Sequence, residues 1–209
     1  MSPDLWLAFV AASTALLLIP GPTVLLILSY ALSKGRGVAL ASVGGVALGD
    51  LVAMTASLLG LGALVLASAT LFTALKWIGA VYLVWLGICL IRSASSTELT
   101  LPQGAQVTGS GVFWHAAVVT ALNPKSIAFF IAFVPQFVVV DAPLAPQFVF
   151  LISTFVGLAA MNALAYALLA DRMHARIAPP SAIAWISRAG GGALITMGLA
   201  TALIRRGTS

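Results

Sequence analysis

Charged side chains are scarce in this sequence. Asp, Glu, Lys and Arg together make up 7% of its 209 residues, whereas soluble chains carry roughly 25%. Hydrophobic residues make up 61%, and the mean hydropathy is +1.12. The composition therefore excludes a soluble domain and predicts a polytopic membrane protein surrounded by the lipid bilayer.

Cysteines and metal-binding patterns are also lacking. The single cysteine, Cys89, lies in an apolar block, so neither an internal disulfide nor a dithiol redox pair is available. Neither His115 nor His174 has a second ligand at metal-binding spacing. No Ser-His-Asp set, phosphate-binding loop or pair of carboxylates occurs. We therefore expect no metal, no cofactor and no enzymatic activity.

Basic residues outnumber acidic ones, giving a net charge of +5. They stand singly between apolar blocks, which argues against a nucleic-acid partner and is typical of topology signals. The basic residues of alternate short loops would share one side of the membrane: Lys34, Arg36, Arg92, Arg172 and Arg176. The positive-inside rule makes that side cytoplasmic and places both termini outside. Lys76 and the Arg205–Arg206 pair do not fit this orientation.

Six apolar blocks reach the 20 or so residues that a spanning helix needs. They cover residues 5–28, 39–67, 71–91, 112–138, 147–170 and 183–204. The turn between the second and third blocks is expected near residues 68–70. The pattern predicts an all-α fold of six transmembrane helices in a single domain, residues 1–209.

Proline interrupts the first and fourth blocks. The first reads "IPGPTVLLIL", with the run Pro20-Gly21-Pro22, and the fourth reads "ALNPKSIAFF", with the run Asn123-Pro124-Lys125. A proline inside a helix removes a backbone donor and costs about 3 kcal/mol. Aligning Pro22 with Pro124 also aligns the apolar runs that follow.

These matched interruptions suggest two repeats of three spans each. The repeats would cover about 5–91 and about 112–204, joined by a cytoplasmic linker at 93–110. Because three is odd, the second repeat must lie inverted in the membrane, an arrangement typical of secondary transporters. In the alternative interpretation the prolines only kink their helices, which membrane proteins tolerate.

Two charged residues fall near the middle of predicted spans. Asp50 lies about twelve residues into the second block, and Lys125 lies at similar depth in the fourth, where a charge costs about 2.5–3.5 kcal/mol. We expect the two to face one cavity from opposite halves, although a static ion pair is the alternative. Asn123 and Asn162 lie at similar depth, and for both a helix–helix hydrogen bond stays an open alternative.

Small residues recur every four positions before Asp50. Ala41, Gly45 and Gly49 would lie on one face of the second span. Small residues allow another backbone to approach closely, so this face is predicted to pack against a neighbouring helix.

Four stretches together resemble the LysE/RhtB family of bacterial amino-acid exporters: "PGP", "GGVALGD", "VYLVWLG" and "LNPKSIAFFIAFVPQFV". The resemblance extends over nearly the whole chain. It implies efflux of an amino acid such as threonine, homoserine, leucine or lysine across the bacterial cytoplasmic membrane. It also implies that the proton gradient drives this export.

A mechanism follows as a hypothesis. The prolines would free the carbonyls of Leu16, Leu18 and Thr120, and these oxygens together with Asp50 suit an ammonium group. Half-helices beginning near Thr23 and Lys125 would offer their N-termini to a carboxylate. Asp50 is also the expected proton carrier. The predicted substrate contacts are Pro20, Gly21, Pro22, Thr23, Asp50, Asn123, Pro124, Lys125 and Asn162.

Other functions stay open. The chain could be an exporter of the same superfamily that transports another small solute or a cation. Transport of a metal ion would, however, require more ligands than Asp50 alone. A purely structural membrane scaffold would not explain the matched helix breaks. A receptor or a channel stays possible, and counterflow of labelled substrate would distinguish a carrier from a channel. A homo-oligomer is compatible with the sequence.

Overall fold

The computed structural model describes residues 1–19, 21–34, 36–67, 69–93, 108–139 and 142–173, and the helical positions 185, 188–189, 192, 195–196 and 199. Most of the described residues are helical, and none of them forms a strand. The elements in chain order are α1 (Pro3–Leu18), α2 (Pro22–Lys34), α3 (Arg36–Ala67), α4 (Ala69–Ser93), α5 (Gly109–Ala121), α6 (Pro124–Ala132), the 3₁₀ helix η1 (Val134–Phe137) and α7 (Leu144–Met173).

Two of these helices are long and apolar enough to cross a membrane alone. They contain the stretches Gly37–Gly60 of α3 and Leu144–Leu169 of α7. Two further pairs would each make one bent span: Pro3–Leu18 with Pro22–Ala31, bent by 56°, and Gly109–Ala121 with Pro124–Phe137, bent by 44°. The described residues therefore hold two candidate spans, or four if each bent pair is one span.

The predicted architecture of six spans is only partly visible. α4 contains a shorter apolar stretch, Ala80–Cys89, while most of the sixth block and residues 94–107 of the linker lie outside the described residues. Six spans and inverted repeats therefore stay predictions. The helix interruptions do occur at the two proline runs, and α3 ends at Ala67 with α4 starting at Ala69, close to the turn expected there.

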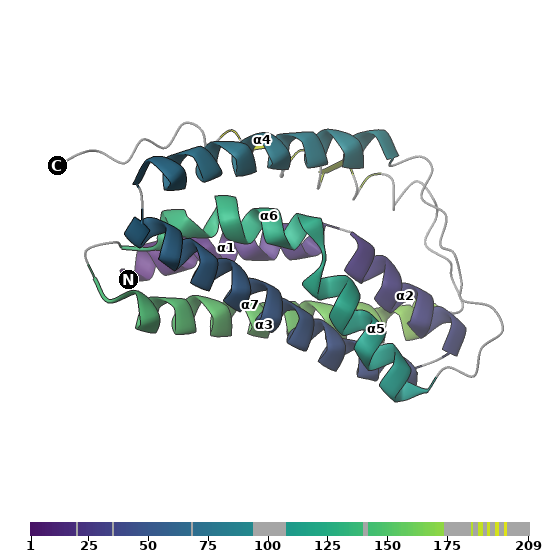
Figure 1. Cartoon of the computed structure of the whole chain (residues 1–209). Coiled ribbons are helices and arrows are strands. Elements are labelled where there is room, and N and C mark those ends of the chain that lie inside the picture. Colours follow the sequence, from purple (N-terminus) through teal and green to yellow (C-terminus); the bar gives the residue numbers. More distant parts are fainter. Residues whose placement is uncertain are drawn as a thin grey trace.

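The long helix α3 organises the bundle (Figure 1). It packs against α5 and α7, whereas α4 lies along one side of the bundle next to α6. The core has two apolar clusters. One is rich in aromatic rings, including Phe130 and Phe155 in edge-to-face contact at 4.8 Å between centroids. The other joins small and branched residues of α2, α3, α5 and α7, among them Ile27, Val46 and Ala163.

The row of small residues on α3 faces α5. A Cβ on Gly45 would collide with the carbonyl oxygen of Phe113, and one on Gly49 would lie 2.5 Å from the carbonyl oxygen of Ala117. The Cβ of Ala41 lies 3.8 Å from the position that a Cβ on Gly109 would take. The two helix backbones thus touch at a distance that only glycine permits.

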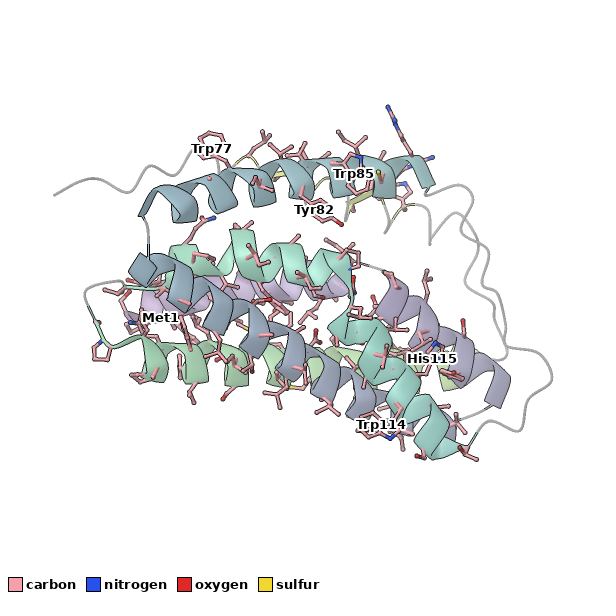
Figure 2. The ribbon with its side chains drawn as sticks, viewed as in Figure 1. Met1, Trp77, Tyr82, Trp85, Trp114 and His115 are labelled. Carbon is pink, nitrogen blue, oxygen red and sulfur yellow. The ribbon has the colours of Figure 1, made fainter. Side chains whose placement is uncertain are left out.

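The outer surface carries large apolar side chains. Trp77, Trp85 and Trp114 are each exposed by half or more (51%, 54% and 60%), and Figure 2 shows Trp77 on the outer side of α4 and Trp114 on α5. Exposed apolar surface on this scale is costly in water. It suits the surface of a bundle that lies in lipid.

Candidate functional site

The two helix breaks contact each other. Pro124 begins α6, and the side chain of Asn123 caps that helix by accepting a hydrogen bond from the Lys125 backbone N–H at 3.1 Å. The amide nitrogen of Asn123 donates to Thr23 Oγ1 at 3.2 Å, in the first turn of α2. Thr23 Oγ1 also lies 3.3 Å from Thr120 Oγ1 at the end of α5. The break after α1 is therefore hydrogen-bonded to the break after α5.

Side chains from α6 and α7 cap the C-terminal end of α1 by donating hydrogen bonds to its last carbonyl oxygens. The last carbonyls of a helix have no partner within the helix and carry its partial negative charge. Lys125 Nζ donates to the carbonyl oxygens of Leu16 at 3.1 Å and Ile19 at 2.8 Å. Asn162 Nδ2 donates to Leu17 O at 3.0 Å, and Tyr166 OH donates to Leu18 O at 3.1 Å.

These contacts correct one expectation from the sequence. The carbonyls of Leu16, Leu18 and Thr120 are not bare. Leu16 O also accepts from the Ile19 N–H, and Thr120 O accepts from the Asn123 N–H at 3.1 Å. The prolines did remove helical donors, but side chains and cap N–H groups replaced them, because an unpaired carbonyl inside the bundle would cost several kcal/mol, on the order of a lost hydrogen bond.

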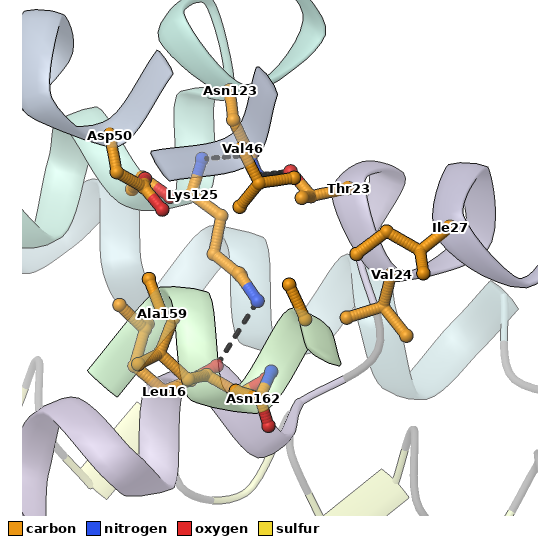
Figure 3. A pocket seen from close by; sticks show the side chains of 13 residues that line it. Leu16, Thr23, Val24, Ile27, Val46, Asp50, Asn123, Lys125, Ala159 and Asn162 are labelled. Carbon is orange, nitrogen blue, oxygen red and sulfur yellow. Dashed lines mark hydrogen bonds between the residues drawn. The ribbon is translucent and has the colours of Figure 1, made fainter. Parts of the chain in front are cut away.

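A small cavity lies where these elements meet (Figure 3). Its volume is about 20 Å³, room for about one water molecule rather than an amino acid. Its polar lining residues are Thr23, Asp50, Asn123, Lys125, Ser126 and Asn162. Leu16 and Ala159 of the aromatic-rich cluster and Ile27, Val46 and Ala163 of the other cluster supply apolar walls. The cavity therefore lies between the two halves of the core.

Asp50 is the least satisfied group in this cavity. Its side chain is 2% exposed, and its Oδ1 atom has no hydrogen-bond partner. Lys125 lines the same cavity, but its ammonium group turns away from Asp50 towards the end of α1 (Figure 3). The static ion pair considered above is thus not formed between these two described residues. A buried acceptor without a partner is costly and commonly marks a functional position.

The structure brings together five of the predicted contact residues: Thr23, Asp50, Asn123, Lys125 and Asn162 line the cavity. Gly21 lies beside it, against Lys125. A Cβ on Gly21 would be 3.3 Å from Lys125 Nζ, so Gly21 leaves room for the lysine side chain. Pro22 and Pro124 begin their helices, and Pro20 lies outside the described residues.

A second cavity is larger but lacks suitable chemistry. It has a volume of about 280 Å³ and lies between α4 and the α5–α6 break, lined by Ile78, Tyr82, Leu122, Pro124, Ile127, Ala128 and Ile131. Tyr82 points from α4 towards α6 (Figure 2). No charged side chain is among these residues, so the smaller polar cavity is the better candidate for recognising a charged solute.

Three side chains of the site were missed from the sequence: Ser126, which lines the cavity, Tyr166, and the hydroxyl group of Thr120, of which only the carbonyl was predicted to take part. Tyr166 follows Asn162 by four residues on α7, so both fall on one helix face and reach the end of α1 together. Thr120 precedes Asn123 by three residues and reaches Thr23. The four-residue spacing from Asn162 was a usable signal for Tyr166. The partner of Thr120 depends on how α2 and α5 pack, which no local pattern reveals.

Apolar helices with two broken segments meeting at a buried polar cavity are typical of membrane transporters. A model of the family described as "LysE type translocator" matches residues 14–206. The chain belongs to this LysE family, and it is accordingly a transporter rather than an enzyme.

Relatives with names support the same class. The homoserine/homoserine lactone efflux protein of Salmonella typhimurium is 33% identical over 205 residues, covering 98% of this chain and 99% of the relative. The leucine efflux protein of Enterobacter sp. is 30% identical over 134 residues, 64% of each chain. An uncharacterized membrane protein of Vibrio cholerae is 33% identical over 181 residues, 87% of this chain and 88% of the relative. No solved structure matches the chain significantly.

Proposed function

We propose that this chain exports amino acids across the bacterial cytoplasmic membrane and that proton influx drives the export. Relatives named for efflux of homoserine, homoserine lactone and leucine support an amino-acid substrate. Homoserine and leucine share an α-ammonium and an α-carboxylate group and differ in the side chain. We therefore expect the site to recognise these two shared groups.

The observation that carries the proposal is the unpartnered Oδ1 of Asp50 in a cavity formed by two helix breaks. Asp50 and the carbonyl end of α1 suit an ammonium group. The first turns of α2 and α6 lie at the same cavity through Thr23 and Lys125, and the positive ends of their dipoles favour a carboxylate. A zwitterionic amino acid carries both an ammonium group and a carboxylate group, one for each of these two parts of the site.

The volume of the cavity implies a cycle with more than one conformation. A space of about 20 Å³ holds no amino acid, so the described conformation is closed around the site. The bends at the α1–α2 and α5–α6 breaks are the natural hinges, because the backbone there is not held by helical hydrogen bonds. Opening to one side and then to the other would give alternating access.

Asp50 is the proposed proton carrier. A buried carboxyl with a free acceptor atom can take a proton without losing a protein hydrogen bond. Binding of substrate on the cytoplasmic side and of a proton on the other would couple efflux to proton influx.

The second candidate is export of another small solute or a cation. A metal ion would need several oxygen, nitrogen or sulfur ligands. Within the part of the chain that the structure describes, no group of three or more His, Cys, Asp or Glu residues could hold one. The ammonium of an amino acid needs fewer acceptors, so the amino-acid proposal fits the site better.

The test uses purified protein in proteoliposomes with radiolabelled L-leucine and L-homoserine. We expect counterflow of at least one of them, and accumulation against its gradient when a pH gradient is imposed. Asp50→Asn should lose gradient-driven accumulation, whereas counterflow should be weakened by the lost ammonium contact but not abolished. Full gradient-driven accumulation by Asp50→Asn would exclude Asp50 as the carrier, and absence of counterflow in the wild type would overturn amino-acid export.

A further inference from the structure

In the described conformation, the ammonium group of Lys125 holds the end of α1. We propose that Lys125 stands in for the substrate: the amino group of an incoming amino acid displaces Lys125 Nζ from the carbonyls of Leu16 and Ile19, and Lys125 returns when the amino acid leaves. This inference rests on the proposed function and deepens it, because it assigns a position to the substrate ammonium and a switching role to a residue of the protein.

The first argument is the chemistry of the donor. Lys125 Nζ donates to two carbonyl oxygens, at 3.1 Å and 2.8 Å. A primary ammonium has three N–H donors and no acceptor, and the α-ammonium of an amino acid presents the same three donors. Because the carbonyl end of a helix attracts any cation, a position that binds the ammonium of Lys125 also suits that of a substrate.

The second argument is the free acceptor of Asp50. Its Oδ1 atom is buried without a hydrogen-bond partner and belongs to the cavity that Lys125 and Leu16 also line. A displaced Lys125 therefore has a charged acceptor in the same cavity. In the closed conformation the lysine satisfies α1 and leaves Asp50 unpaired, and with substrate bound the lysine would pair with Asp50 instead.

The third argument is the space around the lysine. Gly21 lies against the far end of the side chain, where a Cβ would be 3.3 Å from Nζ and 3.4 Å from Cε. Gly21 directly precedes α2, which begins at Pro22, so the lysine head is bordered there by backbone without a side chain. The head can leave the carbonyls without moving a neighbouring side chain at this point.

The exchange has a use in the transport cycle. An exporter must return to the cytoplasmic side without its substrate, and an empty ammonium site would leave the carbonyl of Ile19 without its Lys125 donor and that of Leu16 with only the Ile19 N–H. Such groups are costly in the membrane. Lys125 satisfies them during the return, and the protein can close around its own ammonium group.

The test compares wild type with Lys125→Met, which keeps the length of the side chain and removes its ammonium. Binding to protein in lipid nanodiscs is measured for L-leucine, for isoamylamine, which is leucine without its carboxylate, and for 4-methylpentanoate, which is leucine without its ammonium. With the internal competitor removed, we expect isoamylamine to bind about tenfold more tightly to Lys125→Met than to wild type, the effect of one charge-assisted hydrogen bond.

The opposite pattern would overturn the inference. If Lys125 binds the substrate carboxylate, Lys125→Met leaves the affinity for isoamylamine unchanged and weakens leucine and 4-methylpentanoate about tenfold. Tyr166→Phe is the matched control, because it removes a neighbouring donor to α1 without removing a charge. A tenfold gain for isoamylamine in Tyr166→Phe as well would show that a loosened helix end suffices, which also overturns the inference.

Two further measurements keep the result decisive. Where Lys125→Met does not fold, Lys125→Gln, which replaces the ammonium with a weaker neutral donor, is expected to show a smaller gain for isoamylamine in the same direction. Counterflow by the wild type tests the exporter separately. Counterflow with unchanged amine affinity in the lysine variants overturns only the displacement of Lys125, whereas absent counterflow with tighter amine binding overturns the export and retains the ammonium site.

Discussion

Asn123 donates a hydrogen bond to Thr23, 100 positions earlier in the chain, with 3.2 Å between Nδ2 and Oγ1. This bond joins the two helix breaks, and Thr120 adds a second contact to the same hydroxyl group. The breaks are thus one structural unit built from two distant segments. A change at either break is expected to be felt at the other.

Thr23→Val tests this connection. The substitution keeps the shape of the side chain but removes the oxygen that accepts from Asn123, leaving a buried amide donor unpaired. We expect it to lower the free energy of unfolding by about 1–3 kcal/mol and to weaken leucine counterflow. Thr23→Ser, which keeps the hydroxyl, should remain close to wild type in both measurements. Equal loss in the valine and serine variants would contradict a role for the hydrogen bond.

Gly45→Ala should disrupt the contact between α3 and α5. A Cβ at this position meets the carbonyl oxygen of Phe113 and the Cβ of Ala116, so the helices must separate. Overpacking of this kind costs about 1–3 kcal/mol, measured by unfolding in mixed detergent micelles. Gly157→Ala on α7 is the matched control, since nothing lies within 4 Å of its added Cβ. A stable Gly45→Ala variant would contradict the close helix approach.

Gln147, in the first turn of α7, forms hydrogen bonds with the backbone between Val139 and Pro143, just before this helix. Its Oε1 accepts from the Val139 N–H at 2.8 Å, and its Nε2 donates to the carbonyls of Val139 at 2.9 Å and Pro143 at 3.0 Å. Gln147→Leu should lower the melting temperature, with a loss of about 1–3 kcal/mol. Ser153→Ala, which removes one exposed hydrogen bond on the same helix, should lie within about 0.5 kcal/mol of wild type. Similar melting temperatures for the two variants would exclude a stabilising role for these hydrogen bonds.

Tyr30 of α2 and His115 of α5 form a contact between these two helices. Tyr30 OH lies 2.8 Å from His115 Nδ1, and the rings meet edge to face at 6.0 Å between centroids. A double-mutant cycle with Tyr30→Phe and His115→Ala should give a coupling energy of about 0.5–1.5 kcal/mol in the free energy of unfolding. Additive effects of the two substitutions would show that the contact contributes nothing to stability.

The helix interruptions were predictable from the sequence, because proline acts on its own segment. Pro22 and Pro124 begin α2 and α6, and the chain bends just before each. The shared cavity of Asp50 and Lys125 followed from a physical argument about depth, since charges in a membrane interior gather around polar space. The match to the LysE family confirmed the resemblance drawn from the sequence motifs.

The contacts of Lys125 were not predictable in the same way. Its ammonium reaches the carbonyls of Leu16 and Ile19, more than 100 positions earlier. These hydrogen bonds depend on how α1, α6 and α7 pack together. Considered by charge alone, Asp50 was the expected partner of Lys125. Local patterns identify which groups lose their helical partners, whereas only the tertiary structure decides which side chains replace those partners.

The end of α1 is shared between two neighbours. Lys125 of α6 holds two of its last carbonyls, and Asn162 and Tyr166 of α7 hold the two between them. If α6 and α7 move apart, α1 can follow only one of them, and it must give up a complete pair of hydrogen bonds to do so. In the described conformation the end of α1 satisfies both sets of donors at once, so a separation of α6 from α7 would force α1 to keep one pair and lose the other.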